Sequence, residues 1–218
     1  MPIPFYIIII LLSLTVALMA WKSIRSSFLV WFIPFLLITL ITELGGAYYK
    51  YVLDRNNAWI YNAYLLLQVA FFSVLYFHYL RIAAQQKLIL ITSFIYLLTA
   101  TGFYVYTGSW NSFNAIIFAT GGFMVTSFAV LFLLYYFSLD NSEEEAALLP
   151  LIFICTGVII YFSVVSITIT LYKYLQFYNS EWGGVRLYNL IPRILSIIMY
   201  SLFTYAFYLC STRKILKY

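Results

Sequence analysis

The chain has 218 residues, of which 65% are hydrophobic and only 9% are charged, and its mean hydropathy is +0.96. So little polar surface cannot cover a soluble globule, and the composition therefore predicts an integral membrane protein. The formal net charge is +5. Because the basic residues lie between apolar stretches and form no basic face, this charge does not indicate nucleic-acid binding.

Seven apolar stretches are long enough to be considered as membrane spans, since a bilayer core about 30 Å thick requires about 20 apolar residues per helix. In chain order they are residues 3–20, 28–49, 59–80, 88–106, 113–137, 148–172 and 188–210. The segments between them are short, so no soluble domain is expected. The sequence predicts an all-α, polytopic membrane protein with seven transmembrane helices in one domain, residues 1–218.

The first stretch, residues 3–20, follows no basic region, and no A-x-A site precedes Trp21. We therefore expect a retained helix and not a cleaved signal peptide. Lys22 and Arg25 follow this helix, and their side of the membrane carries more Lys and Arg than the other side. Because basic loops stay in the cytoplasm, this bias predicts an inner or plasma membrane protein with its amino terminus outside and its carboxyl terminus cytoplasmic.

In the second stretch, Glu43 interrupts a run of Phe, Leu and Ile. A charge at mid-membrane costs about 3 kcal/mol or more on insertion scales, so this carboxylate requires a partner, a water-filled cavity or a proton. Arg193 in the last stretch has a similar predicted depth, about 8 Å below the outer surface at 1.5 Å per residue. Two alternatives remain open: a structural ion pair between Glu43 and Arg193, and a ligand or proton site.

Polar side chains also recur at helical spacing on other stretches. Stretch 88–106 carries Thr92, Tyr96 and Thr99 on one face. Hydroxyl groups on transmembrane helices often serve only as contacts between helices, but Asn, Gln, Arg and Glu at such positions favour a polar cavity. The predicted ligand-binding residues are Glu43, Tyr61, Tyr64, Gln68, Ser166, Thr170, Asn189 and Arg193.

The acidic run "SLDNSEEEAALLP" has a structural explanation, because Ser142 and Glu145 have the spacing of a capping box at a helix start. His78 is the single histidine, so a multi-histidine metal site cannot form. The sequence also contains none of the G-x-S-x-G or H-E-x-x-H motifs of hydrolases. We therefore expect no enzyme activity, no catalytic residue, no metal and no cofactor.

Two segments resemble each other: "YYKYVLDRNNAWIYN" (48–62) and "LYKYLQFYNSEWGGVRLYN" (171–189) share Y-K-Y, then W, then Y-N. Both connect predicted helices on the same side, as in two parallel three-helix units joined by a middle helix. This 3+1+3 arrangement is similar to that of SWEET-type sugar transporters, whose halves are parallel repeats, although the Pro-Gln signature of the PQ-loop relatives does not occur. The stretch "IYNAYLLLQ" resembles small uncharacterised seven-helix membrane proteins of bacteria, a resemblance that implies no function.

Two functions from different classes fit these observations, and a purely structural role as a membrane partner is a third alternative. The first is a proton-coupled carrier of a small molecule, with a polar cavity that opens outward between rocking helices. The second is a receptor or sensor subunit, which binds a ligand in the same cavity and signals through a separate cytoplasmic protein partner because its own loops are too short for an output domain. In both cases the expected partners are membrane lipid and a small-molecule ligand, with no nucleic acid. A polar path through the inner half would favour the carrier.

Overall fold

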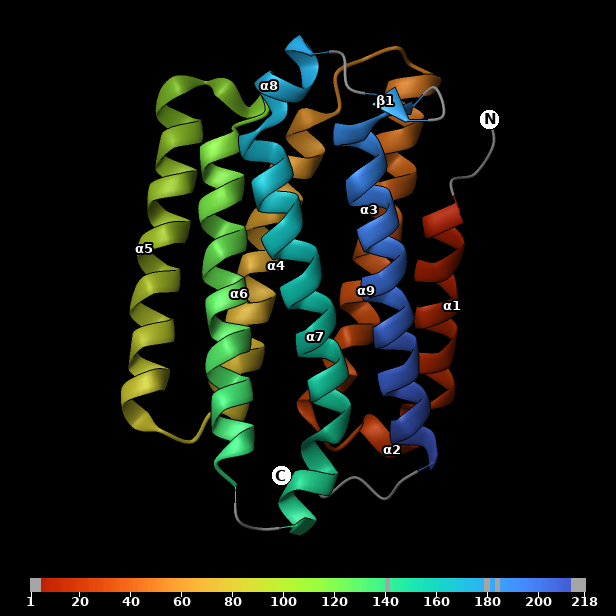
Figure 1. Cartoon of the computed structure of the whole chain (residues 1–218), viewed down its shortest axis with the longest axis vertical. Coiled ribbons are helices and arrows are strands. Elements are labelled where there is room, and N and C mark those ends of the chain that lie inside the picture. Colours follow the sequence, from red (N-terminus) through yellow and green to blue (C-terminus); the bar gives the residue numbers. More distant parts are fainter. Residues whose placement is uncertain (1–4, 140–141, 179–180, 183–184, 213–218) are drawn as a thin grey trace.

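The computed structural model describes residues 5–139, 142–178, 181–182 and 185–212, and it consists of long, roughly antiparallel helices (Figure 1). A two-stranded antiparallel hairpin lies near one end of the bundle. The elements are α1 (Phe5–Met19), α2 (Trp21–Ile24), the 3-10 turn η1 (Phe28–Trp31), α3 (Phe32–Tyr51), α4 (Ala58–Tyr79), α5 (Ala83–Thr107), η2 (Ser109–Asn111), α6 (Ala115–Phe137), α7 (Ser142–Thr170), α8 (Tyr172–Phe177), β1 (Glu181–Trp182), β2 (Val185–Arg186) and α9 (Leu187–Thr212).

The length and apolar composition of these helices confirm a helical, multi-pass membrane protein. Among the described residues, six helices are long and apolar enough to cross a membrane: α3 with its preceding turn, α4, α5, α6, α7 and α9. The remaining predicted span, residues 3–20, corresponds to α1, which is apolar but has 15 residues in the described part of the chain. At 1.5 Å per residue it is about 22 Å long, less than a bilayer core of about 30 Å.

Six of the apolar helices form a closed ring, and α5 lies outside it. Around the ring, α1 packs on α3, α3 on α4, α4 on α6, α6 on α7, α7 on α9, and α9 on α1 again. Helix α5 packs mainly on α4 and less extensively on α6, and Figure 1 shows it at the edge of the bundle. The interior of the ring is therefore the place where side chains from most helices can meet.

The two ends of the bundle are distinguished by their connections. The end at which α1 begins, called here the upper end as in Figure 1, also carries loops 52–57 and 108–114 together with α8, β1 and β2. The lower end, at which α9 ends, carries α2 and the short α4–α5 connection. At the upper end, the buried Asn62 side chain donates to the carbonyls of Trp110 (2.8 Å) and Ser112 (2.9 Å), and so fixes one loop to α4.

Aromatic rings fill the ring interior below its upper third. The Phe35 and Phe71 rings stack with centroids 4.1 Å apart, and the Phe72 ring meets the Phe162 ring edge-on at 5.9 Å. We call these four side chains the aromatic block. Phe32 continues the packing toward the lower end, with centroid distances of 5.6 Å to the rings of Phe203 and Phe207.

The helix boundaries differ from the predicted stretches by four or more residues at three starts, one of which is α5, which begins at Ala83 and not at residue 88. α3 begins at Phe32 after a separate 3-10 turn, four residues later than predicted, whereas α7 begins at Ser142, six residues earlier. The early start of α7 includes the acidic run, as expected for carboxylates near the positive end of a helix dipole. The predicted capping contact of Ser142 lies outside the described side chains.

Candidate functional site

Glu43 lies on α3 in the upper half of the ring, where its half-buried side chain accepts two hydrogen bonds. The hydroxyl of Tyr6 on α1 donates to Glu43 Oε2 at 2.9 Å, and the hydroxyl of Tyr61 on α4 donates to the same oxygen at 3.2 Å. Three helices of the ring thus meet at one carboxylate. Because both bonds go to Oε2, the Oε1 atom remains able to accept from another group.

Gly46, one turn after Glu43, allows Tyr61 to reach this position. A Cβ atom at Gly46 would lie 2.7 Å from Tyr61 Oη and 2.9 Å from Tyr61 Cζ, both closer than real side chains approach. The Gly46 carbonyl also accepts a hydrogen bond of 2.9 Å from the Asn57 side chain, just before α4. The glycine therefore sets how closely the upper ends of α3 and α4 approach each other.

Arg193 does not form the contact ion pair that matched depth had led us to consider. Its side chain on α9 is exposed and lies within electrostatic range of Glu43, but among the described residues no ion pair within 4.0 Å joins the two. Helix α1 packs against both α3 and α9. Its Tyr6, and not Arg193, contacts the carboxylate at Oε2.

A second layer of hydroxyl groups surrounds the carboxylate on its inner side. Buried Tyr64 hydrogen-bonds Thr39, whose own hydroxyl donates to the Phe35 carbonyl at 2.8 Å. The Tyr64 and Tyr200 hydroxyls interact, and the hydroxyl of Tyr161 interacts with Ser196 of α9. We use the name tyrosine cluster for Glu43 together with Tyr6, Tyr61, Tyr64, Tyr161 and Tyr200, which come from α1, α3, α4, α7 and α9.

The other predicted site residues are divided between the interior and the surface. Gln68 and Ser166 are buried on α4 and α7. Thr170 is exposed, and its hydroxyl donates to the Ser166 carbonyl at 2.8 Å, as hydroxyls within helices commonly do. Asn189 is exposed in the first turn of α9, at the upper end. Thr170 and Asn189 therefore lie outside the tyrosine cluster.

Sequence reasoning did not include Tyr6, Tyr161 or Tyr200 among the site residues. Tyrosines are common at membrane interfaces, so among the 22 tyrosines of this chain the sequence alone does not single out the three that reach the site. A signal did exist for Tyr6, because no other residue between it and Ser13 is polar. Such an isolated hydroxyl in an apolar helix needs a partner, and the partner is Glu43.

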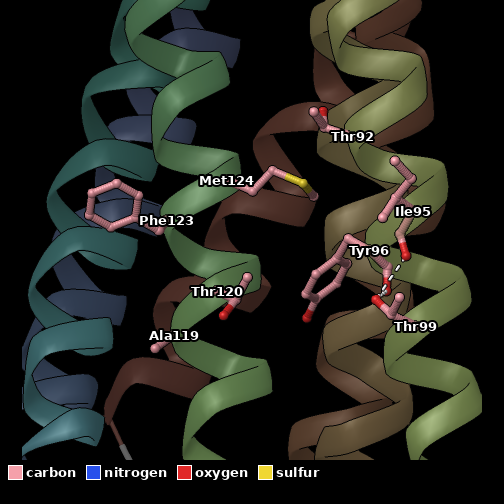
Figure 2. Close-up of a pocket in the computed structure, with 8 residues that line it drawn as sticks. All are labelled: Thr92, Ile95, Tyr96, Thr99, Ala119, Thr120, Phe123 and Met124. Carbon is pink, nitrogen blue, oxygen red and sulfur yellow. Dashed lines mark hydrogen bonds between the residues drawn. The ribbon is translucent and has the colours of Figure 1, made fainter.

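A separate groove lies on the outer side of the ring, between α5 and α6 (Figure 2). It has a volume of about 650 Å³ and contains the predicted polar face of α5, but the hydroxyls there bond mainly to backbone carbonyls, such as Tyr96 to Ile117 at 2.9 Å. Its lining is therefore largely apolar and suited to lipid. The lining residues are Thr92, Ile95, Tyr96, Thr99, Ala119, Thr120, Phe123 and Met124.

Comparisons with known proteins do not add a relative to this description, because no family model, curated protein or solved structure matches the chain. The chemistry of the site must follow from its own groups. Among the described residues, no group of three or more His, Cys, Asp or Glu side chains is placed to hold a metal ion. What the tyrosine cluster offers is one carboxyl group with a free oxygen, surrounded by phenol hydroxyls and rings.

Proposed function

We propose that this protein binds a small polar solute at the tyrosine cluster and carries it across the membrane coupled to protons. The observation that carries this proposal is the environment of Glu43, a carboxylate inside the bundle. Two tyrosine hydroxyls donate to it, and among the described residues no cation forms an ion pair with it. Ionisable groups inside membrane spans are costly, and they commonly mark substrate or proton pathways. A carboxyl group in such a position can exchange a proton for a bound solute.

The order of helices around the ring supports two parallel three-helix units joined by α5. If α1, α3 and α4 correspond to α6, α7 and α9, the neighbours α1–α3 match α6–α7, and α3–α4 match α7–α9. The contact of α4 with α6 likewise matches that of α9 with α1. Corresponding helices also run in the same direction between the two ends (Figure 1). Carriers built from such repeats move one unit against the other around a central site.

A second candidate function is supported by the aromatic block. These rings fill the interior between the tyrosine cluster and the lower end, and Phe72 and Phe162 are fully buried. A carrier must move these rings to release its solute below, whereas a receptor needs no such path. The alternative is therefore a receptor subunit that binds the solute from the upper end and signals through a cytoplasmic protein. In either case, we place the protein in the inner or plasma membrane with its upper end outside.

Purified protein in liposomes distinguishes these functions. Pooled metabolites are added outside, and a pH-sensitive dye inside the liposomes reports proton movement that depends on the solute. We expect the wild type to couple solute and proton movement and Glu43→Gln to lose the coupling. The matched control Glu181→Gln, an exposed glutamate in the hairpin, should behave as the wild type.

Ligand binding is measured on the same variants by thermal shift. If a metabolite stabilises the wild type but not Glu43→Gln, and no solute crosses the membrane, the receptor function replaces the carrier. If Glu43→Gln leaves both ligand binding and proton movement unchanged, the tyrosine cluster is not the binding site.

A further inference from the structure

Gln68 and Ser166 are the two predicted site residues that lie deepest in the ring. Among the described residues, the fully buried Ser166 hydroxyl has no hydrogen-bond partner, and the Gln68 amide, whose polar atoms are not fully enclosed, also forms no hydrogen bond. Each exposes only 5% of its surface. A buried polar group that is left unpaired lowers the stability of a fold, because it has lost its hydrogen bonds to water. Apolar residues of the same size would avoid this cost, so these two side chains call for an explanation.

The aromatic block shows that Gln68 and Ser166 lie at the same level. The rings of Phe72 on α4 and Phe162 on α7 are in contact, with centroids 5.9 Å apart. Gln68 is four residues before Phe72, and Ser166 is four residues after Phe162, so each lies one helical turn from its phenylalanine on the same face. Because α4 and α7 run in opposite directions, both turns lead toward the upper end.

A pair of glycines on α6 supports the same placement. A Cβ atom at Gly122 would collide with Ser166 Oγ, and a Cβ atom at Gly121 would lie 3.1 Å from the side chain of Val69, the neighbour of Gln68. Consecutive residues of α6 thus contact α4 and α7 at one level. Gln68 and Ser166 therefore occupy one layer of the ring, directly above the aromatic block.

This layer continues the polar groups of the tyrosine cluster. Along α4, Tyr61 reaches Glu43, Tyr64 reaches Thr39 one turn below, and Gln68 follows after one further turn. From Tyr61 to Gln68 the distance along the helix axis is about 10 Å at 1.5 Å per residue. Polar side chains thus line the interior from Glu43 down to the aromatic block, which closes the column.

We propose that Gln68 and Ser166 are the second half of the solute site, and that the solute is a small organic cation whose amine binds Glu43 and whose hydroxyl or amide group binds these two side chains. The inference rests on the proposed function and specifies its substrate class. The free Oε1 of Glu43 accepts from an ammonium group, and tyrosine rings attract cations. The amide and hydroxyl below are uncharged and can both donate and accept, which suits an uncharged polar group.

The column also distinguishes this class from zwitterions. A zwitterionic solute would need a cationic partner for its carboxylate where its second group binds, and Gln68 and Ser166 carry no charge there, whereas Arg193 is exposed on α9. The expected solute therefore carries its charge at one end and a neutral polar group at the other.

Cysteine labelling tests the inference without knowledge of the solute. Gln68→Cys and Ser166→Cys are prepared as purified full-length protein in detergent, and folding is verified by thermal unfolding. Each variant is treated with two small methanethiosulfonates, one carrying a trimethylammonium group and one carrying a sulfonate. Val165→Cys is the matched control, because Val165 is equally buried on the same turn of α7, 1% exposed. The wild type with its buried Cys155 and Cys210 is the blank.

We expect both cysteines to react and Val165→Cys to stay inert. The cationic reagent should react roughly a few hundredfold faster than the anionic one, because one charge about 10 Å away at an effective dielectric constant of about 20 attracts the cation and repels the anion by more than tenfold each. Glu43→Gln should remove this preference. The exposed Asn189→Cys is the control for the surface potential, and its relative reaction rates with the two reagents should be the same with and without Glu43→Gln.

Three results would overturn parts of the inference. If Gln68→Cys or Ser166→Cys is as inert as Val165→Cys, the lower half of the site does not exist. If both reagents react equally, or if the preference survives Glu43→Gln, the solute is not an organic cation selected by Glu43. Labelling reports access and charge and needs no transport, so a failure to find transport in liposomes remains a separate result.

Discussion

At the scale of single residues, Glu43 is held in the bundle by groups that are individually ordinary. Two tyrosine hydroxyls donate to one of its oxygens, and Gly46 leaves the space that one of these tyrosines occupies. Each group depends on the others, because Tyr61 can reach the carboxylate only along the bare backbone of Gly46. Substitutions that add or remove one heavy atom can therefore measure how much each contact around Glu43 contributes to stability.

Gly46→Ala tests this dependence against its neighbour Gly45→Ala. We expect Gly46→Ala to destabilise the fold by about 1–3 kcal/mol, as overpacking does, because its Cβ forces Tyr61 away from Glu43. A Cβ at Gly45 meets no atom within 4 Å. Gly45→Ala should therefore stabilise α3 by about 0.5–1 kcal/mol through its better helix propensity. Unfolding in mixed micelles measures both, and equal effects of the two substitutions would contradict the packing described here.

The two hydrogen bonds to Glu43 are tested by removing one oxygen at a time. Tyr6→Phe and Tyr61→Phe should each cost about 0.5–1.5 kcal/mol of stability. The double variant should cost more than the sum of the two, because it leaves the carboxylate without a tyrosine donor. Tyr106→Phe is the control, since Tyr106 is 92% exposed and its hydroxyl should not matter. Strict additivity would show that the hydroxyls do not share an acceptor.

The sequence predicted part of this site, and physical reasons explain the rest. Glu43 and Tyr61 were predicted because a charge in an apolar helix needs polar neighbours and because helical spacing is visible in sequence. The role of Tyr6 was not predicted, because spacing within one helix carries no information about which helix is adjacent. Matched depth alone made Arg193 a candidate partner, but α1 separates α3 from α9 at this level.

At the scale of elements, α4 connects the site with the upper end of the bundle. One face carries Tyr61, Tyr64 and Gln68 into the ring, and Asn62 on another face binds the loop between α5 and α6.

Hydrophobic length predicted the existence of the long helices well, but it could not predict their starts. The start of α7 depends on a polar acidic run that a hydropathy criterion does not count.

The contact between α4 and this loop gives a prediction at the same scale. Asn62→Ala removes the donor to two carbonyls, so we expect a loss of about 1–3 kcal/mol and faster hydrogen exchange in residues 108–114. Asn111→Ala, an exposed change in the same loop, should stay within about 0.5 kcal/mol of the wild type. Unchanged exchange in Asn62→Ala would mean that α4 does not fix the loop.

At the scale of the whole molecule, the short helix α1 contributes both to the packing of the ring and to the site. It is too short to match an average bilayer core, yet it closes the ring by packing on both α3 and α9 and supplies Tyr6 to the site. A short hydrophobic helix can be accommodated by local thinning of the bilayer at modest cost. If α1 crosses the membrane in this way, its two ends must face opposite compartments, and the short connections then determine the threading of every later helix.

This threading can be measured on intact cells with an impermeant thiol reagent. We expect cysteines at the exposed positions Asn111 and Gln176, both at the upper end, to react from outside. Cysteines at Lys22, just after α1, and at Ala84, at the start of α5, should react only after the cells are permeabilised. The bias of basic residues predicts this direction. Labelling of Ala84→Cys in place of Asn111→Cys would show that the chain is threaded in the opposite direction. Labelling of Lys22→Cys together with Asn111→Cys would show that α1 does not cross the membrane.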